Sequence, residues 1–424
     1  MMRFATICFG AAGLAAAATA QDAWSTGFAE NQLGLSGPVS QLLPFGNELI
    51  AVGTFTQAGS ERANYVAAFD GFSWRRLGEG GAFGGGGFSN AAYCATVFRG
   101  QLIAGGFFTQ LGRAGGTTVN RVAAWDGTRW LPLGACPGVT GSFGQVRAMT
   151  VYNDRLYVGG GFAQAGCVQA DNLASWDGTA WSGVTGVGGE TDGFVDALAV
   201  HDGMLVIGGE FDHAGPLAAR GLAAINGSTF TPIAGPGLSF IGKVSSLASI
   251  GGSLYAGGNF DSVNGVAAAD IARYDGTWHP LDGGMFGVDV AAIAEYNGRI
   301  FAGGLFSDAG GVQCNDIAAW DGQGWSALGS GLNGIVVTAA EYRGSLFVGG
   351  SFTNASGVPS SRIARWGPPS CPVDFDGNGF VDFFDYLDYL AAFENADPRA
   401  DLNGDEFIDF FDYLDFVNVF EVGC

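Results

Sequence analysis

The chain has 424 residues, of which 74 are Gly, and 48% of its positions are hydrophobic. This composition excludes a disordered low-complexity chain and favours many short strands joined by tight turns, as in an all-β fold. The formal net charge of −22, with only 18 Lys and Arg residues, excludes nucleic acid and anionic lipid as partners, because both require clustered positive charge.

The N-terminus has the three parts of an export signal. Arg3 is followed by an apolar, Ala-rich run from Phe4, and Ala18-Thr19-Ala20 precedes Gln21 as a small-residue cleavage site. The run is short for a membrane span, and no later segment is long and apolar enough to be one. We therefore expect residues 1–20 to be a signal peptide and the mature chain, without a membrane span, to be secreted, either extracellular or at the cell surface.

A unit recurs seven times between residues 40 and 366. Each copy has an apolar strand, a turn, a strand ending in Gly-Gly-x-Phe or a close variant, and a short strand that ends in a bulky residue before Asp-Gly and a second aromatic residue. The Phe positions are Phe55, Phe108, Phe162, Phe211, Phe260, Phe306 and Phe352. Their spacing of 46 to 54 residues is the size of a four-stranded propeller blade. We predict a seven-bladed β-propeller over residues 21–368, with the Gly pairs in crowded strands and the Asp-Gly turns in outer hairpins.

The seventh unit lacks its outer strand. Trp366 is followed by Gly367-Pro368-Pro369, and proline cannot continue a strand ladder. Trp24 stands 31 residues before Phe55, within the range of 27 to 34 for the same interval in the other units. We therefore predict that the N-terminal segment supplies the missing strand and closes the ring.

These repeats, such as Ile317-Ala-Ala-Trp320-Asp-Gly followed by Trp325, resemble a known group. They are similar to the kelch-related propeller repeats of fungal cortical polarity-marker ectodomains and of many exported bacterial proteins. The resemblance implies the propeller fold but no particular function, because propellers carry ligands, partners and enzymes alike.

The C-terminal segment, residues 369–424, is acidic and contains a second repeat. From Cys371 onward 14 Asp and Glu residues stand against Arg399 alone, a charge of −13. Residues 374–385 and 401–412 both place oxygen-bearing side chains at positions 1, 3, 5, 9 and 12 of a loop, which is the spacing of EF-hand calcium loops. The predicted ligands of two calcium ions are Asp374, Asp376, Asn378, Phe380 (carbonyl), Asp382 and Asp385 in the first loop, and Asp401, Asn403, Asp405, Phe407 (carbonyl), Asp409 and Asp412 in the second.

The two loops differ at position 6. Gly379 permits the sharp turn of the first loop, whereas Glu406 occupies this position in the second, so we expect the second site to be weaker. Without a cation the clustered carboxylates repel one another, so folding of this segment should depend on calcium.

Each loop precedes a similar helix that begins Phe-Phe-Asp-Tyr-Leu-Asp. Paired loop–helix units with Asp at position 12 closely resemble type I dockerins, and the frame from Cys371 to the terminal Gly423-Cys424 resembles the bacterial GC-type variant. The resemblance implies a small α-helical module that docks onto a cohesin-like or other extracellular protein, often through loop positions 10 and 11. These positions hold Phe383, Phe384, Phe410 and Phe411 instead of small hydroxyl residues, a departure from cellulosomal members. The Phe residues form either a binding patch or part of the module core.

Six cysteines lie outside the signal segment, an even number that suits disulfides in an oxidising compartment. Cys371 and Cys424 bracket the C-terminal module and are predicted to pair, although the terminal Gly-Cys also fits a sorting or modification signal. Cys136 and Cys167 lie in loops expected on one face of the ring and form the second predicted pair.

The sequence carries few residues for catalysis. It has three His residues and lacks a nucleophile elbow, a zinc-protease helix and a phosphate loop. Glu210, Asp212, His213 and Arg220 form the best polar cluster, either as ordinary loop residues or as a catalytic group. We interpret the chain as an exported, calcium-binding recognition or structural protein whose propeller takes a glycan or protein ligand. A secreted polysaccharide-active enzyme and a surface protein with a C-terminal sorting signal are the alternatives.

Overall fold

The computed structural model describes residues 22–29, 32–78, 86–112, 116–134, 136, 138–141, 143–187, 193–233, 242–368, 371, 373–375, 381–403, 405 and 407–422. The predicted signal peptide lies outside the described residues. No helix in the described part of the chain is long and apolar enough to cross a membrane.

Seven antiparallel sheets, each with four or five strands, make up most of the described chain. From the innermost strand outward they are β2 (Val39–Phe45), β3 (Glu48–Gly53), β6 (Val66–Phe69) and β7 (Trp74–Arg76); β8 (Ala92–Phe98), β9 (Gln101–Gly106), β10 (Val122–Trp125) and β11 (Trp130–Pro132); β13 (Gln145–Tyr152), β14 (Arg155–Gly161), β17 (Leu173–Trp176) and β18 (Trp181–Val184); β19 (Gly193–His201), β20 (Met204–Phe211), β23 (Leu222–Asn226) and β24 (Thr229–Thr231); β25 (Lys243–Ile250), β26 (Ser253–Asn259), β29 (Ile271–Tyr274) and β30 (Trp278–Pro280); β31 (Met285–Tyr296), β32 (Arg299–Ala309), β34 (Ile317–Trp320) and β35 (Trp325–Ala327); and β36 (Val336–Tyr342), β37 (Ser345–Gly350), β40 (Ile363–Gly367) and β1 (Ala23–Trp24).

In most sheets, short strands lie in the loop between the second and third strands. They are β4 (Gln57–Ala58), β5 (Glu61–Arg62), β12 (Val139–Thr140), β15 (Gln164–Ala165), β16 (Val168–Gln169), β21 (His213–Ala214), β22 (Leu217–Ala218), β27 (Ser262–Val263), β28 (Val266–Ala267), β33 (Val312–Gln313), β38 (Asn354–Ala355) and β39 (Val358–Pro359). Of these, β12 belongs to a between-sheet segment and pairs with β15.

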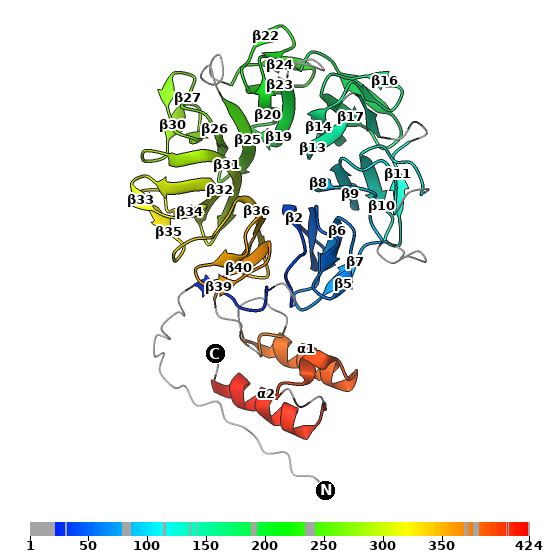
Figure 1. The fold of residues 1–424 in the computed structure, drawn as a ribbon, viewed down its shortest axis with the longest axis vertical. Helices are drawn as coiled ribbons and strands as arrows, with labels where there is room; N and C mark the ends of the chain where they lie inside the picture. Colours follow the sequence, from blue (N-terminus) through cyan, green and yellow to red (C-terminus); the bar gives the residue numbers. More distant parts are fainter. Residues whose placement is uncertain are drawn as a thin grey trace.

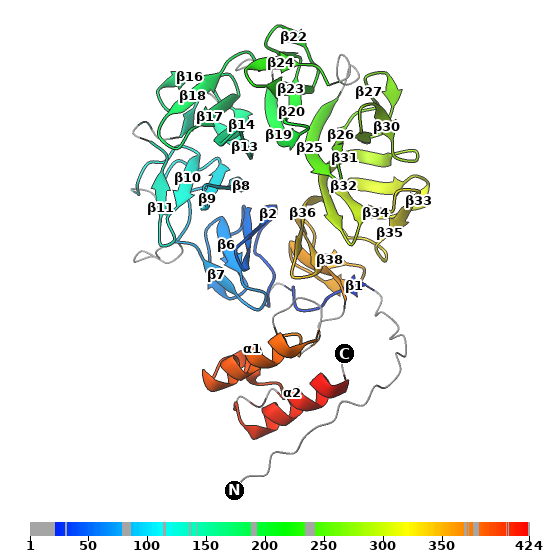
Figure 2. The ribbon, with the colours of Figure 1, turned by 180° about the vertical axis from the view of Figure 1, so that it is seen from behind.

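The sheets stand around a central opening, with the first strand of each sheet innermost (Figures 1 and 2). The last sheet packs on the first: Leu42 N–H donates to Thr338 Oγ1 at 3.0 Å, and Tyr342 O–H donates to Asn47 O at 2.7 Å. This arrangement is a β-propeller, as the repeat predicted.

The N-terminal strand joins the last sheet. Trp24 pairs with Trp366 across β1 and β40, and its indole N–H donates to Leu328 O at 3.1 Å, 304 residues away. The prediction that Trp24 completes this sheet is confirmed.

In most sheets the outer aromatic residue forms a hydrogen bond to the main chain near the preceding sheet. Indole N–H groups donate to main-chain carbonyls at 2.8 to 3.2 Å in six pairs, namely Trp24 to Leu328, Trp74 to Leu33, Trp130 to Leu77, Trp181 to Leu133, Trp278 to Ile233 and Trp325 to Leu281. Each Trp therefore joins two sheets through one buried polar contact in addition to its apolar packing. In the fourth sheet the same position is Phe230, which has no indole donor.

The Gly pairs lie where neighbouring sheets leave no room for a side chain. A Cβ atom on Gly105 would stand 2.7 Å from Val146 Cγ1, and one on Gly208 would stand 2.6 Å from Val244 Cγ1. The first sheet reverses the sizes, because Val52 replaces the first Gly and packs with Ala92 of the next sheet. At each of these contacts one Val side chain, from one sheet or from its neighbour, fills the space between the sheets, which preserves close packing.

The residue directly before the third strand of each sheet adopts a left-handed conformation. The φ angles lie between 62° and 73° at Tyr65, Arg121, Asn172, Gly221, Asp270, Asp316 and Arg362. At Asn172, Asp270 and Asp316 the side-chain oxygen accepts a hydrogen bond from the N–H of the Phe ten residues earlier, at 3.0 to 3.3 Å. Short polar side chains tolerate this backbone conformation and hold the connection in place.

The C-terminal module has two α-helices, α1 (Phe383–Glu394) and α2 (Phe410–Val422), and a 3₁₀ turn, η1 (Pro398–Ala400). The helices are antiparallel, because Tyr389 stacks on Phe416 at 4.0 Å while the earlier Tyr386 meets the later Phe420 at 6.1 Å. Phe375 also packs edge-on against Tyr389. The module has its own small core and lies outside the ring, beside the first and last sheets (Figure 1).

Disulfides are present in both parts of the chain. Cys136 and Cys167 are bonded, with their Cα atoms 5.7 Å apart, which confirms that predicted pair. Cys371 is disulfide-bonded, and its predicted mate, Cys424, lies outside the described residues. Cys94 and Cys314 are buried free thiols.

Candidate functional site

The second predicted calcium loop, residues 401–412, folds back on its own backbone. Asp405 N–H donates to Asp401 Oδ1 at 3.2 Å and to Asn403 Oδ1 at 2.9 Å, and Phe407 N–H donates to Asp405 Oδ1 at 2.9 Å. The side-chain oxygens of three alternating positions are therefore gathered along one tight turn. Glu406 lies outside the described residues.

Asp412 ties the two ends of this loop together. Its Oδ1 atom accepts from Leu402 N–H at 2.9 Å and Asn403 N–H at 3.3 Å, and its Oδ2 atom accepts from Asp409 N–H at 2.9 Å. The side chain is fully buried. Burial opposes ionisation, but the backbone N–H donors outweigh it and lower the pKa of Asp412 below its ordinary value. A buried carboxylate is therefore held in the ionised form beside the gathered oxygens.

The described residues of the first predicted loop show the same arrangement around its last carboxylate. Asp385 is fully buried and its Oδ2 atom accepts from Asp382 N–H at 2.8 Å, as Asp412 does from Asp409. Asp374 lies at the start of the loop, where its N–H donates to Cys371 O at 3.1 Å. Asp376, Asn378 and Phe380, the other predicted ligands, lie outside the described residues.

Position 9 of both loops caps the following helix. Asp382 Oδ1 accepts from Phe384 N–H at 2.7 Å, and Asp409 Oδ1 accepts from Phe411 N–H at 2.8 Å. A carboxylate at this position satisfies an unpaired helical N–H and stabilises the positive end of the helix dipole. The two side chains predicted as position-9 ligands thus also fix where α1 and α2 begin.

The described residues hold no group of three or more His, Cys, Asp or Glu side chains arranged to bind a metal ion. In the second loop the oxygens of Asp401, Asn403 and Asp405 are engaged by the N–H groups of the loop itself. The donor set is made of oxygen atoms alone, which is the chemistry that a hard cation such as calcium prefers.

Both helices begin with exposed aromatic residues. Phe383, Phe384, Phe410 and Phe411 are each 63% or 64% exposed, and Leu387 and Leu414, one turn later, are also exposed. Phe383 stacks on Tyr386, and Phe410 stacks on Tyr413 in the same geometry, at 6.3 Å. Of the two interpretations that the sequence allowed, membership of the core does not hold for these four side chains. Because the helices are antiparallel, the two Phe pairs lie at opposite ends of the module.

Arg399 links the module to the ring. Its guanidinium lies 4.9 Å from the ring centre of Phe72, in the turn between β6 and β7, and 5.5 Å from that of Phe375 in the module. An adjacent pocket of about 230 Å³ is lined from both sides, by Arg343 and Arg365 of the ring and by Cys371 and Asp374 of the module.

The polar cluster predicted in the fourth unit is solvent-exposed. Glu210, Asp212, His213 and Arg220 lie on the exposed edge formed by β20, β21 and the following loop. Their exposure matches that of ordinary loop residues.

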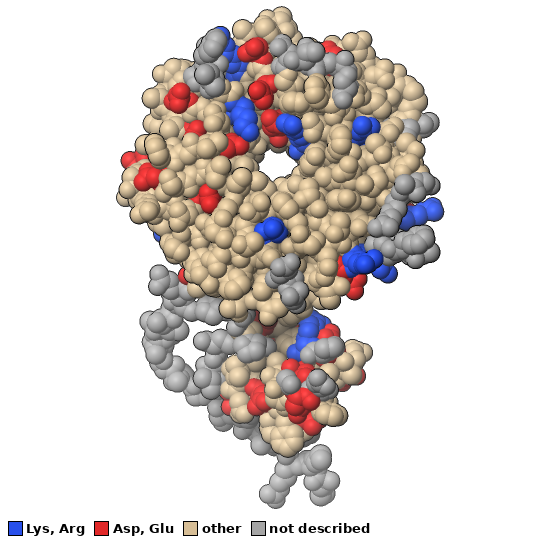
Figure 3. All heavy atoms as spheres, in the orientation of Figure 1, with Lys and Arg blue, Asp and Glu red and all other residues tan. Residues whose placement is uncertain are grey.

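Four charged residues on the inner strands were not predicted as site residues from the sequence. Arg147, Asp196, Lys243 and Asp289 line a pocket of about 320 Å³ at the central opening, where Figure 3 shows acidic and basic side chains together. Their signal in the sequence is the recurrence of a charged residue, at intervals of 46 to 49 residues, in four consecutive inner strands.

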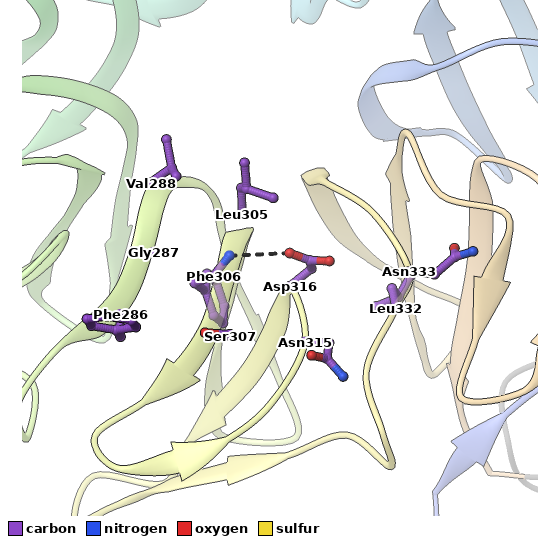
Figure 4. Close-up of a pocket in the computed structure, with 10 residues that line it drawn as sticks. All are labelled: Phe286, Gly287, Val288, Leu305, Phe306, Ser307, Asn315, Asp316, Leu332 and Asn333. Atoms are coloured by element: carbon purple, nitrogen blue, oxygen red, sulfur yellow. Dashed lines mark hydrogen bonds between the residues drawn. The ribbon is translucent and has the colours of Figure 1, made fainter.

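A third pocket, of about 690 Å³, opens beside β31 and β32 (Figure 4). Phe286, Val288 and Leu305 contribute exposed apolar surface to it. Asp316, the only ionisable residue among the described residues that line it, accepts a hydrogen bond from Phe306 N–H at 3.3 Å, and burial raises its pKa. This pocket is an apolar shelf whose acidic residue has a structural role.

Comparison with known proteins gives a short match to a family model of β-propellers. Residues 344–365 match a family described as "Domain of unknown function (DUF5122) beta-propeller". No curated protein matches the chain. Among solved structures, the computationally designed Ika8 protein has 12% sequence identity and a TM-score of 0.44, with 81% of this chain and 100% of that chain covered. The WD40 β-propeller domain of Doa1 has 12% identity and a TM-score of 0.43, with 81% and 97% covered.

Proposed function

We propose that this protein is an exported recognition or structural protein in which a dockerin-like module attaches a seven-bladed, kelch-like propeller to a protein partner. The module binds two calcium ions, and the propeller presents a ligand surface outside the cell or at its surface. The observation that carries this proposal is the exposure of Phe383, Phe384, Phe410 and Phe411 next to the two acidic loops.

Exposed aromatic pairs at equivalent positions favour a binding role. Large apolar side chains are normally buried in a small module, and those left at the surface in clusters mark interaction sites. Aromatic residues also supply much of the binding energy at protein interfaces. The duplication of the pair gives the module two equivalent contact patches.

Calcium accounts for the charge of the module. The alternating oxygens of Asp401, Asn403 and Asp405, with the buried carboxylate of Asp412, provide oxygen donors of the kind that calcium takes. When bound, the ion supplies positive charge that offsets the repulsion among these carboxylates. Because Glu406 replaces the turn Gly of the first loop, the second site is expected to be the weaker of the two.

The aromatic residues at loop positions 10 and 11 define the partner. Cellulosomal dockerins often carry small hydroxyl residues there, whereas four Phe side chains require an apolar acceptor surface. We infer a cohesin-like or other extracellular protein with pockets for aromatic rings.

Affinity capture from the exported proteins of the source, with the full chain as bait, tests this proposal. Wild-type protein in calcium should retain a partner that a chelator releases. Replacing all four Phe residues with Ala should abolish retention, and each double variant, F383A/F384A or F410A/F411A, should weaken it.

The variant F286A is the matched control, because Phe286 is an exposed Phe of the propeller. It should retain the partner as the wild type does. Retention that survives both the chelator and the fourfold substitution would overturn the attachment role.

A further inference from the structure

The innermost strand of every sheet contains a one-residue bulge at the same place. In each, the register skips one residue directly after a buried Val, or after Ala92 in the second sheet. The skipped residues are Ser40, Tyr93, Arg147, Asp196, Ser245, Ala291 and Val337. All seven line the central channel. Bulges re-aim side chains and are common next to functional sites.

The bulge residues differ in chemistry although their surroundings repeat. The preceding residue is Val in six sheets and Ala in one, always fully buried, whereas the bulge positions range from Arg to Val. The repeat therefore keeps the scaffold constant and varies the side chain that faces the channel. Such variation at one position of a fixed frame is typical of a binding surface.

Two ion pairs concentrate the polar groups on one side of the channel mouth. Arg147 Nη1 lies 2.6 Å from Asp196 Oδ1, and Lys243 Nζ lies 3.1 Å from Asp289 Oδ2, on four consecutive inner strands. With Tyr93 and Ser245 they line the pocket of about 320 Å³, at the low end of the size range for small-molecule sites. Two cations and two anions leave this pocket with no net charge.

Hydrogen-bonding capacity remains unused at this mouth. Within the part of the chain that the structure describes, Ser245 Oγ and Asp289 Oδ1 are buried and have no hydrogen-bond partner. Buried polar atoms are usually paired, so an unpaired hydroxyl and carboxylate oxygen in one pocket point to a ligand that supplies their partners.

Aromatic side chains extend the site outward from the ion pairs. The Arg147 guanidinium lies 4.0 Å from the ring centre of Phe194, and Phe143 packs edge-on against Phe194 at 5.6 Å. Phe143 is 52% exposed. On the other side, Leu305 pairs with Asp289 across β31 and β32 and begins the apolar shelf of Figure 4. The polar mouth is therefore flanked by apolar faces.

We propose that this channel mouth binds a neutral saccharide. Sugar hydroxyls both donate and accept hydrogen bonds, as paired Arg, Lys and Asp side chains with Ser245 require, while the C–H faces of a sugar ring suit the exposed Phe143. The balanced charge disfavours a strongly anionic or cationic ligand. The proposal rests on the recognition role given above to the propeller and names its ligand class.

A glycan array probed with the labelled full-length protein tests the site. The array carries neutral, uronate-containing and sulfated glycans, with peptides printed on the same slide. We expect binding to neutral members, and we expect it to persist in chelator because the site lies in the ring. Chelator sensitivity of partner capture is thus a separate result, and failure of one proposal leaves the other standing.

Substitutions at the channel mouth test whether the glycan binds there. The Kd for a neutral glycan bound on the array should rise about tenfold or more in S245A, which loses a buried hydroxyl, and in D289N, which exchanges one carboxylate oxygen for an amide NH2 and removes the negative charge beside Lys243. F143A should also weaken binding. The control E48Q neutralises the carboxylate of the exposed Arg75–Glu48 pair, on the outer part of the first sheet, and should bind as the wild type does.

S245A removes only one oxygen and preserves the ion pairs, so it remains informative if D289N unfolds. Absence of binding to any neutral glycan, a preference for acidic glycans or peptides, or a Kd unchanged in S245A would overturn the proposal.

Discussion

Replacement of Asp270 by Asn is expected to stabilise the propeller at neutral pH. Asp270 is 9% exposed, and burial, with small contributions from Asp289 and Asp261, raises its pKa to about 6 from 3.8. At 1.36 kcal/mol per pH unit, the difference between the folded and unfolded pKa values corresponds to about 3 kcal/mol. The stability contributed by the neutral form is fully present below pH 3.8 and is lost as the pH rises through 6.

The third sheet contains the proposed substitution already. Asn172 occupies the equivalent position, accepts from Phe162 N–H at 3.0 Å, and donates to Val187 O and Gly193 O at 3.1 Å each. D270N should therefore keep the hydrogen bond to Phe260 N–H and remove only the buried charge. The reverse variant, N172D, should destabilise the ring at pH 7.5.

Urea unfolding followed by Trp fluorescence measures this effect. All ten Trp residues precede Gly367, so the signal reports the ring and not the C-terminal module. The gain of D270N over the wild type should grow by about 2 to 3 kcal/mol between pH 4 and pH 7.5. A gain that is independent of pH, or a loss of stability at pH 7.5, would refute the reasoning.

Two further predictions concern the closure and bracing of the ring. W24F removes the indole donor to Leu328 O and should lower the unfolding free energy by about 1 to 3 kcal/mol, with W325F, which loses the same type of contact, as the reference; equal stability of W24F and wild type would argue against the latch. The paired variant C136S/C167S removes a disulfide of sequence separation 31 and should lower the free energy of unfolding in urea by roughly 4 kcal/mol; an unchanged midpoint would count against this prediction.

Much of the ring could be predicted from the sequence because its repeat consists of residue types with strong structural preferences. Gly pairs, Asp-Gly turns and regularly spaced Trp and Phe residues predicted the sheets, the outer hairpins and the place of Trp24. Cys136 and Cys167 could be paired because the repeat placed both loops on one face.

The channel mouth was not predicted, for a geometric reason. Simple alternation along a strand assigns Arg147 and Asp196 to a face, but a bulge shifts that alternation by one residue. The left-handed residues were also missed, because the position holds Tyr, Arg, Asn, Gly and Asp in different sheets and so gives no compositional signal. The exposure of the four Phe residues at the helix starts could not be decided from sequence, since Phe side chains occur both in cores and at binding surfaces.

Calcium titration of the full-length protein by calorimetry, with native mass spectrometry for stoichiometry, tests the central claim most directly. We predict two bound ions in the wild type, loss of both in D385N/D412N, and unchanged binding in D388N/D415N, which makes the same charge change at neighbouring helix positions. No heat of binding in the wild type, or binding that survives in D385N/D412N, would contradict the account.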